Sequence, residues 1–373
     1  MIALGIASAS LLIWVALVGS GFWRTDINDR SASQCIPGAW PTVVAIVPAR
    51  NEADVIARSI GSLVAQDYPG NFSILLVDDE SSDGTADVAR GLGSDCLRIL
   101  PAAPLAPGWT GKLWAVSQGI AAAGAPDYLW LTDADIEHAP DILRVLVGIA
   151  AAGDRQLVSF MAKLRCDTLA ERALIPAFIF FFQMLYPFSR VNRPRGRGAA
   201  AGGCMLVRRT ALEAAGGIAA IRDALIDDCT LGALLKRQGP IWLGLTDRSR
   251  SIRPYDTTAP IAAMIARSAY AQLDYSPLKL AGTILGLALV YFSPPLLVVL
   301  GTGLARWFGL AAWLLMAASF QPMLHFYRRS PLWGLALPAI AAFYAGCTIL
   351  SAWQHKHGRG GMWKGRAQAA MGQ

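Results

Sequence analysis

Charged residues are scarce in this sequence of 373 residues. Asp, Glu, Lys and Arg make up only 16% of the chain, whereas 54% of its residues are hydrophobic. Soluble globular domains contain about 25% charged and about 45–50% apolar residues. The composition therefore excludes a disordered chain and a purely cytosolic enzyme, because the additional apolar side chains need surroundings other than water.

Paired cysteines and clustered histidines are also missing. The six cysteines include no C-x-x-C pair, and the four histidines lack the spacing of a zinc site. Both features are typical of a reduced, cytoplasmic protein without a disulfide framework.

The glycine-rich loops that cradle phosphate are absent as well. No G-x-G-x-x-G follows the first predicted strand, and no G-x-x-x-x-G-K-[ST] occurs. These absences exclude a Rossmann-type dinucleotide site and a P-loop. A bound phosphate would then need a metal ion or basic side chains. Lys112 in the sequence TGK is the candidate, and a solvated lysine at the start of a helix is the alternative.

Basic residues outnumber acidic ones, 33 against 26, and give a net charge of +7. They lie beside apolar segments and form no stripe of the kind that binds nucleic acid, so no nucleic-acid partner is expected. Anionic lipid headgroups attract such residues, which favours the bilayer as a partner. The residues concerned are Arg190, Arg193, Arg195, Arg197, Arg328 and Arg329.

Two uncharged segments lie in the first half of the chain. Residues 2–23 are long enough for one transmembrane helix, and the alternative, a cleaved signal peptide, lacks basic residues before the apolar run. A polar linker is predicted over residues 24–41. Residues 173–188 contain two prolines and are short for a span, which favours an interfacial or re-entrant segment over a buried core helix.

Three apolar stretches predict transmembrane helices within residues 277–354, followed by a basic tail over residues 355–373. The expected location is the inner cell membrane, with several crossings and a catalytic domain that faces the cytoplasm. One N-terminal and three C-terminal crossings would place the tail outside, against the positive-inside rule. Either the segment with Pro294 and Pro295 folds back, or the rule fails here.

Strand and helix patterns alternate through residues 42–276. This alternation is typical of βαβ units and of a mostly parallel sheet with helices on both faces, so the predicted class is α/β. The strands are predicted at residues 43–47, 74–79, 96–100, 128–135 and 157–162, and the helices at residues 52–66, 83–93, 112–123 and 141–152.

Acidic residues stand where two predicted strands end. Asp78 and Asp79 close one strand, and Asp133 and Asp135 close another. Ligands of open α/β sheets bind at the carboxyl ends of the strands, so both pairs are expected to meet at one crevice. Their oxygens suit Mg²⁺ or Mn²⁺, which would neutralise a leaving diphosphate. For each residue the alternative is a helix N-cap.

Six motifs in order resemble the inverting glycosyltransferases of family two, which have the GT-A fold. The apolar helices around this region are similar to the membrane branch that glycosylates lipids, as the ceramide glucosyltransferases do. Two further stretches, PGWTGKLWA (107–115) and RSAYAQLDYSP (267–277), are most similar to the hopanoid-associated glycosyltransferases. The six motifs are VPARNEADVI (47–56), VDDESSDGT (77–85), GK (111–112), TDAD (132–135), GGCMLVRR (202–209) and DDCTLG (227–232).

The resemblance implies a donor site for a UDP-linked nucleotide-sugar. Its first nucleotide-contacting loop corresponds to Pro48, Asn51 and Glu52, and the acid that reads uracil or ribose corresponds to Asp78 or Asp79. Lys112 and Asp133 are expected to contact the donor as well.

The resemblance also implies a metal motif and a general base. Asp133 and Asp135 correspond to the metal motif, with Asp135 as the direct ligand. Asp228 corresponds to the base, and Asp227 stands where the family usually has Glu. The loop beneath the sugar and the acceptor corresponds to Gly202 and Gly203.

One motif of the processive and many lipid-directed relatives, Q-x-x-R-W, is incomplete. The corresponding place reads Gln272-Leu-Asp-Tyr, without the Arg-Trp pair. This departure argues against a processive polysaccharide synthase and leaves the cation for the diphosphate unassigned. Arg267 is the candidate, and an arginine that extends along the membrane surface is the alternative.

The sequence therefore predicts a membrane-bound, metal-dependent, inverting hexosyltransferase. It would move a sugar from a nucleotide-sugar to a hydroxyl of a membrane lipid, for which a hopanoid is one candidate. A polyprenyl-phosphate glycosyltransferase or a polysaccharide synthase is the first alternative. A non-catalytic nucleotide-binding scaffold or transporter is the second.

Overall fold

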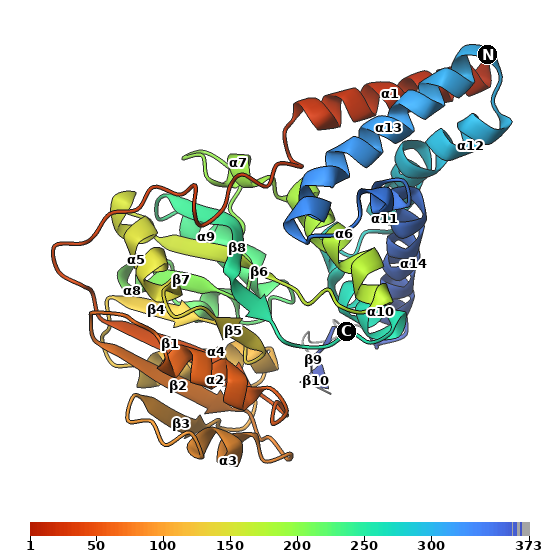
Figure 1. Cartoon of the computed structure of the whole chain (residues 1–373). Coiled ribbons are helices and arrows are strands. Elements are labelled where there is room, and N and C mark those ends of the chain that lie inside the picture. Colours follow the sequence, from red (N-terminus) through yellow and green to blue (C-terminus); the bar gives the residue numbers. More distant parts are fainter. Residues whose placement is uncertain (360, 364–365, 368–373) are drawn as a thin grey trace. The chain divides into compact units, whose positions relative to one another are not determined.

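The computed structural model describes residues 1–359, 361–363 and 366–367, and the rest of the predicted basic tail, residues 360, 364–365 and 368–373, lies outside them. The chain divides into two units (Figure 1). The sheet unit comprises Asp26–Arg165, Phe188–Pro254 and the described residues from Gly361 onward. The helical unit comprises Met1–Thr25, Cys166–Pro187 and the described part of Tyr255–Gly360. Residues 173–187 thus belong to the helical unit, although they lie within residues 42–276, the region predicted as the α/β domain.

The sheet unit contains an eight-stranded sheet in the order β3-β2-β1-β4-β7-β6-β8-β5. β1 pairs in parallel with β2 and β4, β2 with β3, and β6 with β8, whereas β7 and β5 join antiparallel. The strands are β1 (Val43–Ala49), β2 (Phe72–Asp78), β3 (Leu97–Pro101), β4 (Tyr128–Leu131), β5 (Ile136–His138), β6 (Leu157–Lys163), β7 (Met205–Arg208) and β8 (Ile241–Ser251). A separate pair, β9 (Met362–Trp363) and β10 (Arg366–Ala367), follows near the C-terminus.

Helices cover both faces of this sheet, as the apolar strands predict. All seven residues of β1 are buried. Val43 and Val47 face the cluster formed with α2, α3 and α5, whereas Ile46 faces α4. A Cβ on Gly119 would lie 2.6 Å from Ile46 Cγ2, so glycine permits the close approach of α4. The helices of this unit are α2 (Ile56–Val64), α3 (Thr85–Arg90), α4 (Gly111–Ala122), α5 (Ile142–Ala152), α7 (Phe188–Val191), α8 (Arg209–Ala214), the 3₁₀ turn η1 (Ile218–Ile221) and α9 (Asp227–Lys236).

Residues 26–41, predicted as part of a linker, instead pack on the sheet unit. Asn28 forms a β-bridge with Leu245. The Asp29 side chain is 4% exposed, accepts a hydrogen bond from Thr246 Oγ1 at 2.8 Å and forms an ion pair with Arg248. This polar segment is held on the sheet unit because Asp29 pairs with Arg248 on a strand far away in the sequence. Composition alone does not reveal this pairing.

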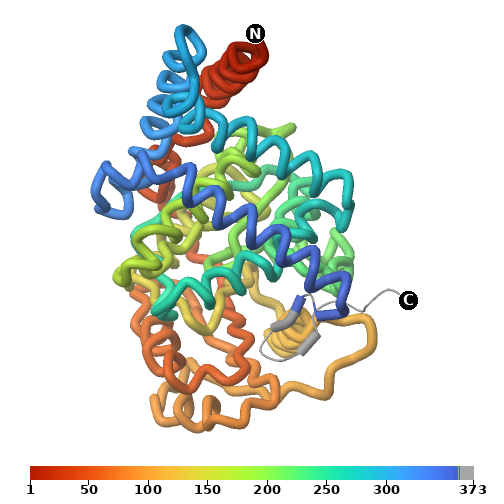
Figure 2. Tube along the Cα trace, turned by 90° about the vertical axis from the view of Figure 1, so that its right-hand side faces the viewer, coloured from red at the N-terminus to blue at the C-terminus, as the bar shows by residue number. Residues whose placement is uncertain are grey.

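The helical unit holds the other long helices. Within it α1 lies along α13, and α14 lies along α10 (Figures 1 and 2). Its elements are α1 (Ile2–Gly19), α6 (Leu169–Leu185), α10 (Thr258–Ser268), η2 (Ala271–Leu273), α11 (Pro277–Leu287), η3 (Ala288–Phe292), α12 (Ser293–Leu300), α13 (Gly303–Phe326), η4 (Pro331–Gly334) and α14 (Leu337–Lys356).

Five helical segments among the described residues are long and apolar enough to cross a membrane: Ile2–Gly19, Leu169–Val191, Pro277–Leu300, Gly303–Phe326 and Leu337–Lys356. The pair Pro294-Pro295 does not break its segment into two helices. A π-helical stretch, η3, precedes the prolines and keeps α11 and α12 continuous.

The apolar segment predicted at residues 173–188 begins earlier in the structure. α6 starts after Thr168, whose side chain accepts from the Glu171 N–H while the Glu171 carboxylate accepts from the Thr168 N–H. This capping box satisfies two of the helix's free N–H groups. Glu171 is fully buried, and its other oxygen accepts from the Tyr255 N–H at 2.8 Å. The charged first turn is therefore part of the helix.

Substitution of Asp29 by Ala is expected to lower the free energy of unfolding by about 1–3 kcal/mol, because Arg248 and Thr246 lose a buried charged partner. The measurement is unfolding of the detergent-solubilised chain, followed by tryptophan fluorescence. Asp67→Asn is the control, since the Asp67–Arg144 pair is 45% exposed on both sides and is expected to contribute less than about 1 kcal/mol. Equal losses in the two variants would contradict the packed role of Asp29.

Candidate functional site

The site lies at the carboxyl ends of three adjacent strands. β1 is hydrogen-bonded to β2 on one side and to β4 on the other. The register pairs Pro48 with Val77 and Ala49 with Asp78, so the loops that follow β1 and β2 leave the sheet together. The loop after β4, with Asp133 and Asp135, starts from the same edge. Parallel pairing thus brings three predicted motifs to one place.

The first two loops are held to each other by hydrogen bonds. Asn51 has a left-handed backbone conformation with φ 52°, which asparagine tolerates better than most residues. Its N–H donates to Ser81 Oγ at 3.0 Å, and its side-chain oxygen accepts from the Ser82 N–H at 2.9 Å. The Glu52 N–H donates to Thr85 Oγ1 at 2.8 Å. These bonds fix the predicted nucleotide-contacting loop against the acidic loop.

Asp78 and Asp79 have different surroundings. Asp79 is fully buried, and Arg50 Nη1 lies 3.7 Å from Asp79 Oδ2. Asp78 is half-buried, and its Oδ1 is a buried atom without a hydrogen-bond partner among the described residues. Asp78 is half-buried whereas Asp79 is fully buried, so Asp78 is the better placed of the two to accept a hydrogen bond from a ligand.

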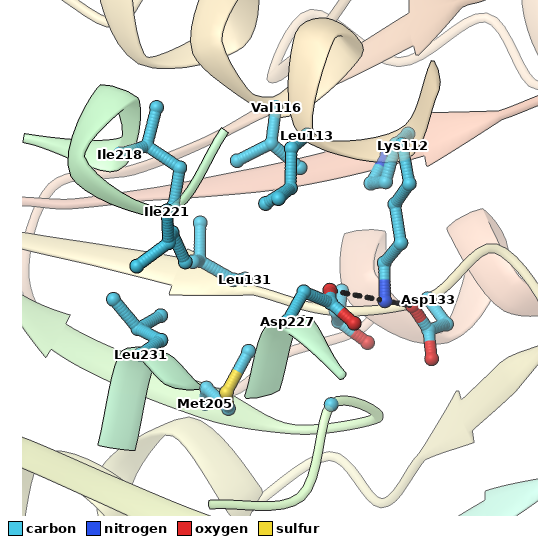
Figure 3. Close-up of a pocket in the computed structure, with 13 residues that line it drawn as sticks. Lys112, Leu113, Val116, Leu131, Asp133, Met205, Ile218, Ile221, Asp227 and Leu231 are labelled. Carbon is cyan, nitrogen blue, oxygen red and sulfur yellow. Dashed lines mark ion pairs between the residues drawn. The ribbon is translucent and has the colours of Figure 1, made fainter. Parts of the chain in front are cut away.

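Lys112 lies at the centre of the site (Figure 3). Its ammonium is 2.8 Å from Asp133 Oδ1 and 3.0 Å from Asp227 Oδ2. The side chain is only 17% exposed, and apolar residues, Leu113, Leu131 and Leu231 among them, line the adjoining pocket. Burial alone would lower the pKa of Lys112, but the two carboxylates outweigh it and raise the pKa. Lys112 is therefore charged and holds two acidic residues together.

The two acidic residues at residues 227–228 open α9. Ile226 is the N-cap residue, so both aspartates belong to the first turn of the helix. Asp228 Oδ2 accepts from the Gly202 N–H at 3.0 Å, and Oδ1 accepts from the Cys229 N–H at 2.7 Å. A Cβ on Gly202 would lie 3.5 Å from Lys112 Nζ and 3.6 Å from Asp228 Oδ2. Glycine thus leaves the space between these two charged groups open.

The pKa of Asp228 is raised to about 6. Burial raises it most, and the negative charge of Asp227 raises it further. Lys112 and the N–H groups of Cys229 and Gly202 oppose this rise. A carboxylate with such a pKa is a stronger base than an exposed aspartate, yet it is ionised at neutral pH.

Asp135 and Glu52 share one arginine that the sequence analysis does not identify. Arg253 Nε donates to Asp135 Oδ2 at 2.7 Å, and Nη2 donates to both oxygens of Glu52 at 2.7 Å. The Ile252 N–H donates to the Asp135 carbonyl at 2.9 Å, so the end of β8 brings Arg253 beside the loop after β4. The sequence analysis predicts no strand at β8 (Ile241–Ser251), so it gives no signal that Arg253 lies at the site.

The two acidic pairs do not form the single carboxylate cluster that their positions predict. Among the described residues, no group of three or more His, Cys, Asp or Glu side chains could hold a metal ion. Asp79 faces Arg50, Asp133 faces Lys112, and Asp135 faces Arg253. Mg²⁺ commonly takes one or two carboxylates together with substrate phosphates, so Asp133 and Asp135 fit such an ion only when a diphosphate supplies further oxygens.

The remaining predicted residues lie as follows. Gly203 packs against the core, where a Cβ would lie 3.1 Å from Ala162 Cβ, and its carbonyl accepts from Thr132 Oγ1 at 2.9 Å. Arg267 is on α10 in the helical unit, so its role toward a diphosphate stays a prediction. Gln272 lies at the incomplete motif. Its side-chain oxygen accepts a hydrogen bond from the Tyr186 hydroxyl, and its side-chain nitrogen donates one to the same hydroxyl.

Comparison with known proteins gives matches to one family. Residues 44–216 match the family described as Glycosyl transferase family 2. Two curated relatives are beta-monoglucosyldiacylglycerol synthases from Trichormus variabilis and Nostoc sp., 30% and 29% identical over 199 residues. These residues are 51% of this chain and 40% of each relative, so the match spans less than half of the relatives' length.

A solved structure resembles nearly the whole chain. It is the mannosyltransferase PcManGT from Pyrobaculum calidifontis in complex with GDP-Man and Mn²⁺, with a TM-score of 0.57 and 18% identity over 94% of this chain and 99% of that one. At this identity the likeness shows the fold alone. The predicted GT-A-type α/β class is confirmed, and residues 44–216 are similar to the glycosyltransferase family 2 domain.

Proposed function

We propose that this chain is a membrane-bound, inverting glycosyltransferase. It transfers a sugar from a nucleotide-sugar, UDP-linked, to a hydroxyl of a membrane lipid. The observation that carries the proposal is the position of Lys112 between Asp133 and Asp227, with Asp228 alongside. This arrangement supports a donor whose diphosphate end lies near Lys112, next to the proposed base.

Asp228 is proposed as the general base. The acceptor oxygen attacks the anomeric carbon from the face opposite the diphosphate while Asp228 takes its proton, and the bond from the anomeric carbon to the phosphate oxygen breaks. The electron pair of that bond leaves with the diphosphate. The N–H groups of Gly202 and Cys229 hold both carboxylate oxygens of Asp228 in place. No covalent intermediate on the enzyme is needed.

Asp133 and Asp135 would hold a divalent cation when the donor is present. When bound, Mg²⁺ or Mn²⁺ supplies positive charge to the leaving diphosphate. Lys112 adds a second positive charge on the same side. The unpartnered oxygen of Asp78 is proposed to accept a hydrogen bond from the nucleoside.

A membrane location for the acceptor is supported by the apolar helices. α6 is one of the candidate spans, yet β6 precedes it and β7 and β8 follow it in one hydrogen-bonded sheet. Both ends of α6 must therefore lie on the same side of a bilayer, which favours an interfacial or re-entrant segment. We propose that α6 provides the lipid acceptor's access, in an inner membrane whose cytoplasmic face carries the sheet unit.

Substitution of Asp228 by Asn or of Asp135 by Ala is expected to abolish most turnover while the fold is kept. Loss of a general base lowers the rate by about 10²–10⁴-fold. The measurement is release of nucleoside diphosphate from UDP-sugars by detergent-solubilised protein with lipid extract and Mn²⁺ or Mg²⁺, alongside thermal unfolding. Asp67→Asn is the control with unchanged turnover. Wild-type rates in Asp135→Ala would refute its assignment, whereas insensitivity to Asp228→Asn alone would favour a phosphate acceptor.

The acid limb of the pH profile of kcat/KM is expected near pH 6, because Asp228 accepts a proton only when ionised. Asp227→Asn removes a negative neighbour and should move the limb to lower pH. Lys112→Met removes a positive neighbour and should move it to higher pH. Shifts in the same direction, or no shift, would contradict the proposed charge arrangement around Asp228, even if both variants turn over slowly.

The acceptor class can be identified by mass spectrometry of lipid extracts. Cells that contain the chain are expected to hold a glycosylated lipid that is missing from cells without it or with Asp228→Asn. A hopanoid product would agree with the local sequence resemblance, and a glycosyldiacylglycerol with the curated relatives. Long polysaccharide products or no new product on any lipid would refute a lipid glycosyltransferase.

A further inference from the structure

We propose that Arg253 is a displaceable counter-ion of Asp135, which occupies this carboxylate until a divalent cation and the donor replace it. The inference rests on the proposed function, because it takes Asp135 as a ligand of that cation. It assigns a positioning role to Arg253, which none of the motifs described above includes.

The geometry of Arg253 places its charge on the metal motif. Its Nε is 2.7 Å from Asp135 Oδ2, and the two side chains are 27% and 17% exposed. Both groups are thus partly shielded from water. An ion pair in such partly buried surroundings is stronger than one at an open surface. A cation that binds Asp135 Oδ2 has to break this pair, so the arginine lowers the affinity of the site for metal alone.

Glu52 keeps Arg253 in the site after such a displacement. Arg253 Nη2 contacts both carboxylate oxygens of Glu52 at 2.7 Å, and Glu52 is 7% exposed. Glu52 itself is fixed, since its N–H donates to Thr85 and its carbonyl accepts from Val55 and Ile56. The guanidinium can therefore leave Asp135 without leaving the loop after β1. Its freed N–H group then has an anion to bind, the donor's diphosphate.

Arg253 thereby answers the question raised by the incomplete Q-x-x-R-W motif. Arg253 lies within the sheet unit and already contacts Glu52, a predicted donor-site residue, and Asp135, the predicted metal ligand. Its planar guanidinium suits a phosphate oxygen as well as a carboxylate. Metal and nucleoside diphosphate should consequently bind with positive cooperativity. The metal alone has to break the pair between Arg253 and Asp135, and the diphosphate alone finds Arg253 already occupied by Asp135, so each ligand removes the obstacle that the other meets.

The test is calorimetry of the full-length protein in detergent with Mn²⁺ alone, with UDP alone and with Mn²⁺ in saturating UDP. For Arg253→Gln we expect Mn²⁺ alone to bind about tenfold more tightly, the effect of one charge-assisted hydrogen bond. UDP alone should bind more weakly, and the cooperativity between the two ligands should fall. Arg253→Lys keeps the charge without the forked contact and should lie between Gln and wild type.

Arg250→Gln is the matched control, because Arg250 is an exposed arginine on β8, three residues before Arg253, and donates to the Asp247 carbonyl. Unchanged Mn²⁺ affinity in both Arg253 variants would overturn the inference, provided that Asp135→Ala loses Mn²⁺ binding. Loss of Mn²⁺ binding in Arg253→Gln with unchanged thermal unfolding would overturn it as well. Full Mn²⁺ binding in Asp135→Ala would instead refute the metal assignment in the proposed function.

Discussion

One ammonium group joins parts of the site that are far apart in the chain. Lys112 stands at the start of α4, Asp133 follows β4, and Asp227 opens α9. The lysine is partly buried, so the two carboxylates stabilise its charge and its charge stabilises theirs. Removing the lysine or its carboxylate partners leaves an uncompensated charge in poorly solvated surroundings. That loss is far more costly than the loss of a surface ion pair. The relative position of the loop after β4 and the start of α9, which carry the proposed metal motif and the proposed base, therefore depends on this contact.

The same principle extends across the site. Asp79 has Arg50, and Asp135 and Glu52 have Arg253. Because each of these acidic groups has an internal cation, the loops after three strands keep their arrangement without relying on an external ion. In the proposed function, the leaving diphosphate would bind by replacing some of these internal ion pairs. These cations offset the electrostatic repulsion between neighbouring carboxylates, so the acidic side chains can lie close to one another.

Local patterns predict the features that depend on local physics. Strands buried on both faces read as continuous apolar runs, and strand ends carry the acidic residues, so β1, β2, β4 and Asp133 are found from the sequence. Arg253 is missed because its relation to Asp135 depends on the pairing of β8 with β5, more than a hundred residues apart. The packing of residues 26–41 on the sheet unit has no local signal for the same reason, since the partner of Asp29 is Arg248. The early start of α6 has a local signal, the Thr168-x-x-Glu171 pattern, which a search for uncharged residues passes over.

The return of the chain to the sheet unit at Gly361 limits how the C-terminal helices can be threaded. Gly361 is buried, and a Cβ there would lie 3.2 Å from Leu225 Cδ1, just ahead of α9. The polypeptide therefore departs from the sheet unit after Pro254 and arrives back at it, so any bilayer that it enters in between is traversed an even number of times. The three candidate spans Pro277–Leu300, Gly303–Phe326 and Leu337–Lys356 then cannot all be complete passages, and at least one is a hairpin or lies flat. Such threading leaves residues 361–363 and 366–367 on the same side as the sheet, and for Arg366 among them the positive-inside rule is compatible with a cytoplasmic catalytic face.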